Sequence, residues 1–178
     1  MLNIKRIPGK LESTDGAEIA EAALVLPLVF MLLLGIVWFG RAFNIYSTIT
    51  QAAQQGAITA ARASCATCGN TASSDAAVDN AVYAVMQASS LDPAQIPANP
   101  NPPNPMSCVN PPITPCTTAA NNITICRQVL LNPAVGIQPA QCGTIVSFQY
   151  PFQFDLPFTS LNMQRIVLSA QAQSRMEN

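Results

Sequence analysis

The residue types best suited to chemistry are two cysteines separated by two positions, Cys65 and Cys68. Such a pair occurs in thiol oxidoreductases and as half of a structural zinc site. The chain contains no histidine and no second Cys-x-x-Cys, so a conventional set of zinc ligands is incomplete. No strand of a βαβ unit precedes the pair either. We therefore expect a structural disulfide here, with redox activity and metal binding as the alternatives.

The cysteines as a group indicate an oxidising compartment. All six follow the apolar segment near the N-terminus, and their even number suits complete pairing. Fifteen pairings are possible, and the sequence alone does not choose among them. The disulfide candidates are Cys65, Cys68, Cys108, Cys116, Cys126 and Cys142.

Two carboxylates, Asp75 and Asp79, are four residues apart and could share a helix face, as acid/base catalysis would require. A helix cap and a solvated surface acid are the simpler interpretation. The only lysines are Lys5 and Lys10, so no lysine or histidine in the rest of the chain could activate a serine or threonine. We predict no catalytic residues, no metal, no cofactor and no enzyme.

Charge is scarce and unevenly placed. Only 10% of the residues are charged and the net charge is −1, with no basic cluster beyond the N-terminus. Nucleic-acid binding depends on many cationic contacts to phosphates, so nucleic acid is excluded as a partner. The hydrophobic fraction of 49% is concentrated early in the chain, which indicates a membrane segment.

That segment comprises residues 22–40, which are 19 residues without a charge. As a helix they would span roughly 28 Å of a hydrocarbon core that is about 30 Å thick. Lys5, Arg6 and Lys10 precede the segment and only Arg41 follows closely, so the N-terminus should be cytoplasmic and the remainder exported. A cleaved signal peptide is the alternative, although its apolar region would typically be shorter and end at a small-residue site.

The helical pattern continues past the apolar segment. Residues 43–64 are rich in alanine and contain no proline, so one helix is predicted over residues 17–64. Residues 17–63 of it would extend about 70 Å, more than twice the thickness of a membrane. Pro27 should bend it within the bilayer. Its outer half should present an apolar stripe to a globular domain: Ile45, Ile49, Ala52, Ala53, Gly56 and Ala60.

The exported domain, residues 65–178, is predicted to be α+β. A helix over residues 75–90, capped by Asp75, would pack through Val78, Val82, Tyr83, Val85 and Met86. Nine prolines make residues 91–117 an extended loop, which Cys108 and Cys116 would tie down.

Three strands are expected after that loop, at residues 122–131, 144–154 and 165–176. They would form a small antiparallel sheet with one apolar face, covered by the outer half of the long helix. The predicted buried faces are Ile123, Ile125 and Val129 in the first strand, Val146, Phe148, Tyr150, Phe152 and Phe154 in the second, and Ile166, Leu168, Ala170 and Ala172 in the third.

The acids before the apolar segment resemble a processing signal. Gly16 is followed by Ala17 and, five positions after the glycine, by Glu21, which resembles the site that a prepilin peptidase cuts after glycine. The resemblance implies that the new amine of Ala17 on one subunit would pair with the Glu21 carboxylate of a neighbour. Alternatively, Asp15, Glu18 and Glu21 are acids that the dipole of the helix N-terminus favours.

Several stretches together are similar to those of the TadE-like proteins, which are pseudopilins of tight-adherence pilus systems: AEIAEAALVLP after Gly16, the run ending in FGR, AAQQGAITAAR, and the closing LSAQAQSRME. The similarity covers residues 16–62 well and the last strand loosely. It implies a cytoplasmic leader at residues 1–16, removed by a prepilin peptidase.

By this resemblance the protein sits in a bacterial inner membrane as a single-pass pseudopilin that helps to assemble an adhesive pilus. Its head would be periplasmic or extracellular, and its partners would be the lipid bilayer, the prepilin peptidase and other pilin-like subunits, which would contact the long helix. Two other functions stay open. One is a membrane-anchored binding module whose Pro-rich loop contacts a ligand, and the other is a periplasmic thiol oxidoreductase.

Overall fold

The computed structural model describes residues 14–62, 72–108, 115–132, 141–153 and 165–176. Helix α1, Thr14–Ala61, is continuous through Pro27. The chain forms two compact units, Met1–Gly40 and Arg41–Asn178, and α1 contributes to both. The predicted long helix and α+β class are confirmed.

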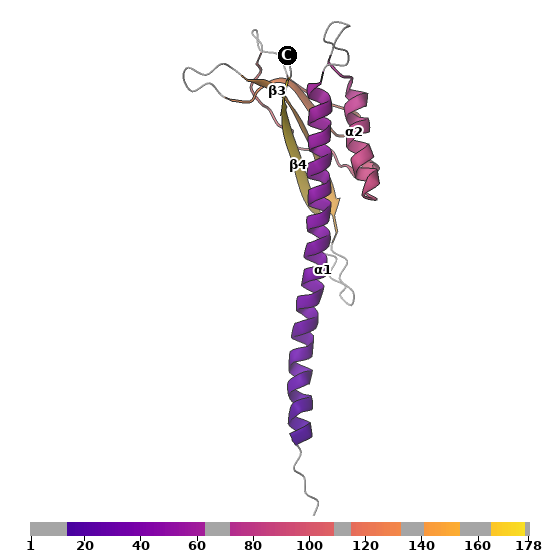
Figure 1. The fold of residues 1–178 in the computed structure, drawn as a ribbon, viewed down its shortest axis with the longest axis vertical. Coiled ribbons are helices and arrows are strands. Elements are labelled where there is room, and N and C mark those ends of the chain that lie inside the picture. The colour runs from indigo at the N-terminus through magenta and orange to yellow at the C-terminus, as the bar shows by residue number, and fades with distance from the viewer. Residues whose placement is uncertain (1–13, 63–71, 109–114, 133–140, 154–164, 177–178) are drawn as a thin grey trace, which may run out of the picture. The chain divides into compact units, whose positions relative to one another are not determined.

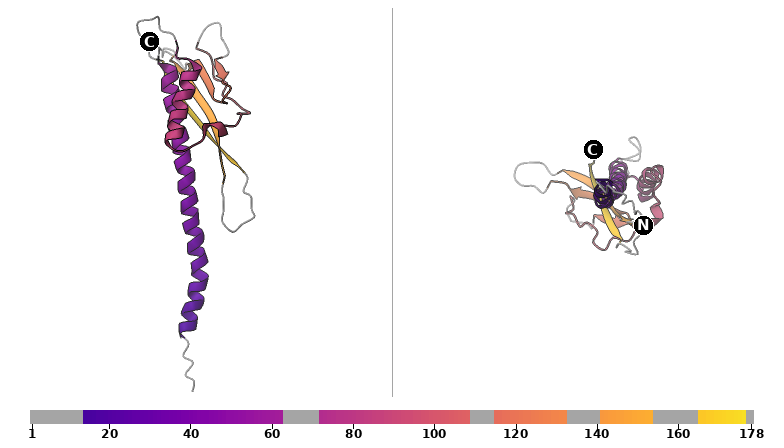
Figure 2. Two further views of the ribbon diagram at one scale, coloured as in Figure 1. Left: turned by 90° about the vertical axis from the view of Figure 1, so that its right-hand side faces the viewer. Right: turned by 90° about the horizontal axis from the view of Figure 1, so that it is seen from below.

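The second unit is a head of helices on an antiparallel sheet (Figures 1 and 2). Its strands follow one another in the sheet in the order β1-β2-β3-β4, and each neighbouring pair is antiparallel. The elements are α2 Asp75–Ala88, the 3-10 turn η1 Pro93–Gln95, β1 Cys116–Thr118, β2 Thr124–Leu130, β3 Cys142–Phe152 and β4 Ile166–Arg175. Strand β1 was not predicted, because three residues are too few to display an alternating pattern.

The core of the head lies between the sheet and the two helices, α2 and the part of α1 after Arg41. The predicted stripe on α1 is confirmed, since Ile49, Ala52 and Ala53 are fully buried. Gly56 lies where α1 passes closest to its neighbours: a Cβ atom there would be 2.7 Å from a methyl of Val82 on α2 and 3.3 Å from one of Val146 on β3. Glycine therefore permits an approach that any side chain would obstruct.

Hydrogen bonds also hold the end of α1 against β3 and α2. The buried Thr144 hydroxyl on β3 donates to the carbonyl of Ala57, 3.1 Å away. Ser73, just before α2, donates to the carbonyl of Thr59 over 2.7 Å. The end of α1 is thus bound to the sheet on one side and to the start of α2 on the other.

The N-terminal cap of helix α2 differs from the prediction. Ser74, not Asp75, is the N-cap, and its side chain accepts from the Ala77 amide at 3.3 Å. At the other end Ser90 has a left-handed φ of 58°, and the Leu91 amide donates to the Met86 carbonyl. That pattern is a Schellman-type stop.

Two predictions of buried strand faces are wrong: Ile166 of β4 is 44% exposed, and the buried face of β2 changes along the strand. Ile125 faces the main core, but Val129 packs on the opposite face with Cys126 and Ile145. The register shifts between Cys126 and Val129, and Gln128 within that bulge has a φ of 54°. One extra residue in the bulge reverses the alternation, which the sequence pattern does not reveal.

Strand β3 is buried more completely than one apolar face would require. Val146, Phe148 and Tyr150 fill the main core as predicted, but Ile145 and Ser147 on the other face are buried as well. The Pro-rich segment covers part of that face, because Gln149 donates to Asn99 over 3.2 Å and Cys108 donates through its amide to the Gln128 carbonyl. Phe154 lies outside the described residues.

Candidate functional site

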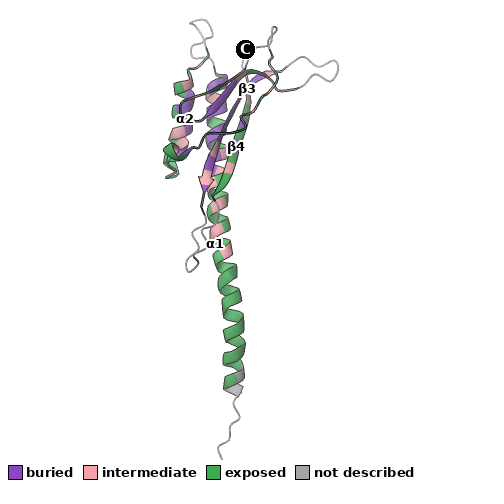
Figure 3. Ribbon diagram, turned by 180° about the vertical axis from the view of Figure 1, so that it is seen from behind, coloured by how far each residue is buried: buried purple, intermediate pink, exposed green. Residues whose placement is uncertain are grey.

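The most unusual surface belongs to the first part of α1. Apart from Gly35 and Trp38, every residue from 18 to 40 is exposed, and none is buried (Figure 3). Leu24 is 68% exposed, Met31 72% and Phe39 76%. Soluble monomers rarely expose contiguous apolar patches of this kind, so the segment requires lipid or another protein around it. By length and hydropathy the helix can cross a membrane.

The residues that resemble a processing site lie at the start of this segment. Gly16, Ala17 and Glu21 all belong to α1, which begins at Thr14. Gly16 and Glu21 are exposed to solvent. The helix thus places the Glu21 carboxylate directly before the apolar residues, where an acid needs a partner if lipid or protein surrounds it.

Two disulfides fasten the Pro-rich segment to the sheet. Cys108 bonds Cys142 at the start of β3, with their Cα atoms 5.8 Å apart. Cys116 of β1 bonds Cys126 of β2, directly opposite in the strand register. The second half of the predicted loop is thus attached to strands β3 and β2. Cys65 and Cys68 lie outside the described residues.

The two acids of α2 have structural partners. Asp75 forms an ion pair with Arg127 of β2, and that arginine also donates to the carbonyl of Ser73 over 2.6 Å. Asp79 accepts from Asn121 at 3.2 Å. Burial raises the pKa of Asp79 above its ordinary 3.8, while the Asn121 hydrogen bond opposes the rise. Both carboxylates therefore attach α2 to the β1–β2 hairpin.

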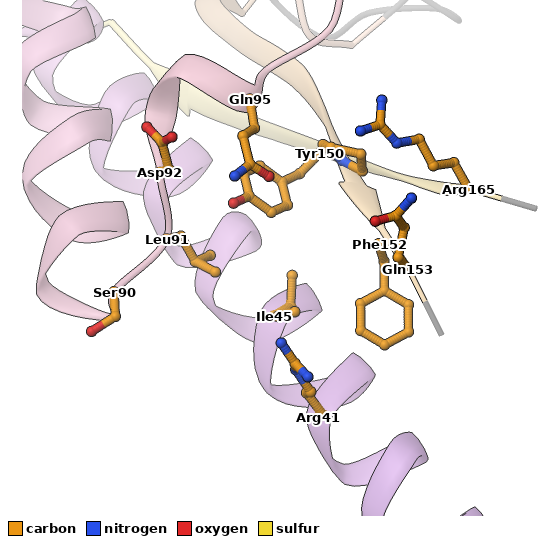
Figure 4. A pocket seen from close by; sticks show the side chains of 11 residues that line it. Arg41, Ile45, Ser90, Leu91, Asp92, Gln95, Tyr150, Phe152, Gln153 and Arg165 are labelled. Atoms are coloured by element: carbon orange, nitrogen blue, oxygen red, sulfur yellow. The ribbon is translucent and has the colours of Figure 1, made fainter. Parts of the chain in front are cut away.

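A polar hollow of about 270 Å³ lies in the head beside the first turns after Gly40 (Figure 4). Two cations line it, Arg41 from α1 and Arg165, which directly precedes β4. Tyr150 lies between them and η1; burial raises the pKa of its phenol, while a backbone hydrogen bond from Asp92 opposes the rise. The other lining residues are Ile45, Ser90, Leu91, Asp92, Gln95, Pro151, Phe152 and Gln153.

This hollow was not predicted from the residue pattern. Arg41 stood out only as the charge after the apolar segment, and Arg165 is 124 positions further along the chain. The register of β3 and β4, which pairs Phe152 with Ile166, is what carries Arg165 to the same end of the head. Among the residues that the structure describes, no group of three His, Cys, Asp or Glu side chains could hold a metal ion.

Comparison with known proteins gives one match. Residues 16–57 match the model of the TadE-like protein family, which confirms the resemblance found in the sequence. The match begins at the glycine of the processing motif and ends beside Gly56, so it covers the exposed apolar segment and most of the stripe packed in the head. No curated protein and no solved structure matches the chain.

Proposed function

We propose that this chain, a TadE-like protein over residues 16–57, is a non-enzymatic pseudopilin anchored in a membrane and used to assemble a tight-adherence pilus. The observation that carries the proposal is the exposed apolar part of α1. The family match falls on this segment, in which every residue from 18 to 40 is exposed apart from the half-buried Gly35 and Trp38.

Insertion of the segment into a bilayer is favourable. Of residues 22–40, 12 are Leu, Ile, Val or Phe. Each such residue contributes roughly 0.3–0.6 kcal/mol at the centre of a membrane, so together they supply up to roughly 4–7 kcal/mol. The cations before the segment favour a cytoplasmic N-terminus, which places the disulfide-bonded head on the oxidising side. An inner membrane of a bacterium has this arrangement.

Under this proposal the chain has three segments with different functions. Residues 1–16 are a cytoplasmic leader, residues 17–64 a helix for contacts with lipid and pilin-like subunits, and residues 65–178 an exported head. A prepilin peptidase would cut after Gly16, a bond that lies in the first turn of α1. Helix ends fray readily, so the bond can become extended for cleavage.

Glu21 gives the processed protein its assembly contact. Once Ala17 is the first residue, its amine is a positive charge that can pair with the Glu21 carboxylate of a neighbouring subunit. Paired charges are much less costly than single ones in a water-poor environment. Glu18 lies three positions earlier and is also exposed, but it is farther from the apolar segment by almost one helical turn.

The test compares Glu21→Ala with Glu18→Ala in the producing cell. We expect Glu21→Ala to reduce surface pili at least tenfold, while Glu18→Ala stays within about twofold of the parent, with equal amounts of both proteins in the membrane. The N-terminus and intact mass of the purified protein give an independent readout, and we expect a start at Ala17.

Pili unaffected by Glu21→Ala, together with a start at Met1, would contradict the proposal. The protein would then be a membrane-anchored binding module that enters no filament. A purified protein that reduces or oxidises a test disulfide would instead indicate an oxidoreductase, and Cys65→Ser would have to abolish that activity.

A further inference from the structure

A second hollow lies on the face of the sheet that is turned away from the two helices. Its floor contains four polar side chains, Ser147 and Gln149 of β3 and Ser169 and Gln171 of β4. Phe148 between them packs with the helices, so its neighbours in β3 point to the other face. The register places Ser147 opposite Gln171 and Gln149 opposite Ser169. Opposite residues have Cβ atoms about 4.5–5.5 Å apart, so the four side chains form one contiguous group.

The Pro-rich segment forms a wall of this hollow through Asn99, Asn101 and Pro103. It is held on both sides of these residues. The carbonyl of Ile96 accepts from a side chain just before β2, and the carbonyl of Met106 accepts from an amide near the end of β2, each over 2.9 Å. The hollow is therefore formed before any ligand arrives, as small-molecule sites usually are.

Ser147 is the residue that indicates a ligand. It is 5% exposed, and its buried hydroxyl has no hydrogen-bond partner among the described residues. Nearly all buried polar groups have a partner, either in the protein or in a bound molecule such as water. Because Ser147 lines the hollow, a molecule that enters it can supply the missing bond. Gln171 on the opposite strand is exposed, so its side chain can turn aside to admit that molecule.

The other polar groups indicate the chemistry of the ligand. Hydroxyl and carboxamide side chains both donate and accept hydrogen bonds. The Asn99 oxygen already accepts from the Asn101 amide at 3.0 Å and from Gln149 at 3.2 Å. The Asn99 amino group, the Gln149 oxygen and the Gln171 side chain can still bond a ligand. Sugar hydroxyls also donate and accept, and the half-buried Pro103 offers an apolar surface to the C–H groups of a sugar ring.

We propose that this hollow binds one sugar ring of a glycan. Its volume of about 200 Å³ is more than tenfold the roughly 10–15 Å³ that one water needs, so a group as large as a sugar ring can enter. A peptide is the less suitable ligand, because the backbone of β3 is already paired with β4 along the floor and offers it no free strand edge.

The inference goes beyond the proposed function and is tested separately from it. The full chain is purified in a polyoxyethylene detergent, because detergents with maltose or glucose head groups would compete for the site. Saturation-transfer-difference NMR is recorded with the methyl pyranosides of glucose, galactose, mannose and N-acetylglucosamine. We expect transfer to at least one of them, and calorimetric titration with that sugar gives its Kd. The Glu21→Ala protein should bind it as the parent does, whatever happens to its pili.

Variants locate the binding. We expect Ser147→Ala and Gln171→Ala each to raise the Kd about fivefold, as the loss of one neutral hydrogen bond would. Gln173→Ala is the matched control, since Gln173 is an exposed glutamine on the same face of β4 but does not line this hollow, and it should change the Kd less than twofold. Ser147→Ala should not lower the urea midpoint, because the hydroxyl has no partner within the described fold.

The remaining outcomes would contradict the proposal. Transfer to none of the four sugars would overturn it, and so would equal changes in Kd for Gln171→Ala and Gln173→Ala. A loss of binding in Ser147→Ala that accompanies a lower urea midpoint, with Gln171→Ala unaffected, would show that the serine acts only on the fold. Transfer to a mixture of random decapeptides, with none to the sugars, would indicate a peptide site instead.

Discussion

Helix α1 contains two stretches with the same backbone and opposite surroundings. From 24 to 39 its side chains are mostly large, apolar and exposed, whereas from 48 to 61 one face is buried and the exposed face is polar. Gln51, Gln54 and Gln55 point to solvent in the second stretch, while Ala52 and Ala53 are fully buried. An apolar sequence alone therefore does not show which part of a helix packs against the rest of its own chain.

Side-chain size makes the distinction. The buried face of the second stretch consists of Thr48, Ile49 and otherwise mainly of alanine and glycine. These small residues let α1 approach α2 and β3 closely, and its Ala57 carbonyl accepts a hydrogen bond from Thr144. The first stretch offers leucine, valine and phenylalanine in every direction. Small residues on one face of a helix indicate close packing against the same protein. Large apolar residues on every face indicate that lipid or another protein surrounds the helix.

The largest expected effect that separates the two stretches comes from the disulfide between Cys108 and Cys142. It joins residues 34 apart, and its loss in the double serine variant should cost the head about 3–4 kcal/mol of unfolding free energy. The stretch before Arg41 should not respond. Hydrogen exchange of the full chain in micelles, read peptide by peptide, measures both regions in one sample.

Removal of the Cys116–Cys126 bond is the matched control for that variant. This bond closes a separation of only 10 residues within one hairpin, so the double serine variant should lose less, about 2–3 kcal/mol. Faster exchange in residues 22–40 of either variant would show that the two stretches are energetically coupled, and the comparison would fail.

The next largest effect concerns glycine in the two stretches. Alanine is the better helix former by about 1 kcal/mol, so Gly40→Ala, which meets nothing within 4 Å, should stabilise α1. In Gly56→Ala the new methyl would press on Val82 and Val146, and overpacking should turn the gain into a net loss of about 1–2 kcal/mol.

Urea titration of the two alanine variants against the parent measures the sign of each change. Opposite signs are the expected result. Stabilisation by both substitutions would mean that α2 can move away from Gly56 without cost, and the close approach would not be essential to the head.

Much of this architecture could be predicted from the sequence, because its signals are periodic and local. The apolar run, the stripe on α1 and the alternation in β3 and β4 each follow from residue spacing. Features that depend on contacts distant in sequence could not be predicted. The pair Asp75–Arg127 joins residues 52 apart, and the bulge at Gln128 depends on how β2 meets β3.

The candidate site divides in the same way. Gly16 and Glu21 are recognisable because their spacing is a short local motif, and the family match includes them. The hollow between Arg41 and Arg165 exists only because the sheet register brings β4 back to the first turns of the head. The positions of isolated arginines in the sequence do not show which of them lie near one another in the fold.

The smallest expected effect is electrostatic and concerns the carboxylate of Asp79. Its pKa is raised in the folded head, chiefly by burial, so the folded state binds more protons than the unfolded chain above the ordinary value of 3.8. Stability should therefore fall as the pH rises from about 3.8 through the raised pKa. Asp79→Asn keeps an oxygen to accept from Asn121 and removes the charge.

We expect Asp79→Asn to flatten this part of the stability profile and to gain under about 1 kcal/mol at neutral pH, since the Asn121 hydrogen bond already offsets part of the cost of burying the charge. Urea midpoints at intervals from pH 4 to pH 7 measure the effect. Glu18→Gln, a carboxylate removed from the exposed stretch of α1, should leave the profile of the head unchanged. A fall in stability for Asp79→Asn at neutral pH would mean that the Asn121 bond needs the charged acid, and that this carboxylate stabilises the head despite its burial.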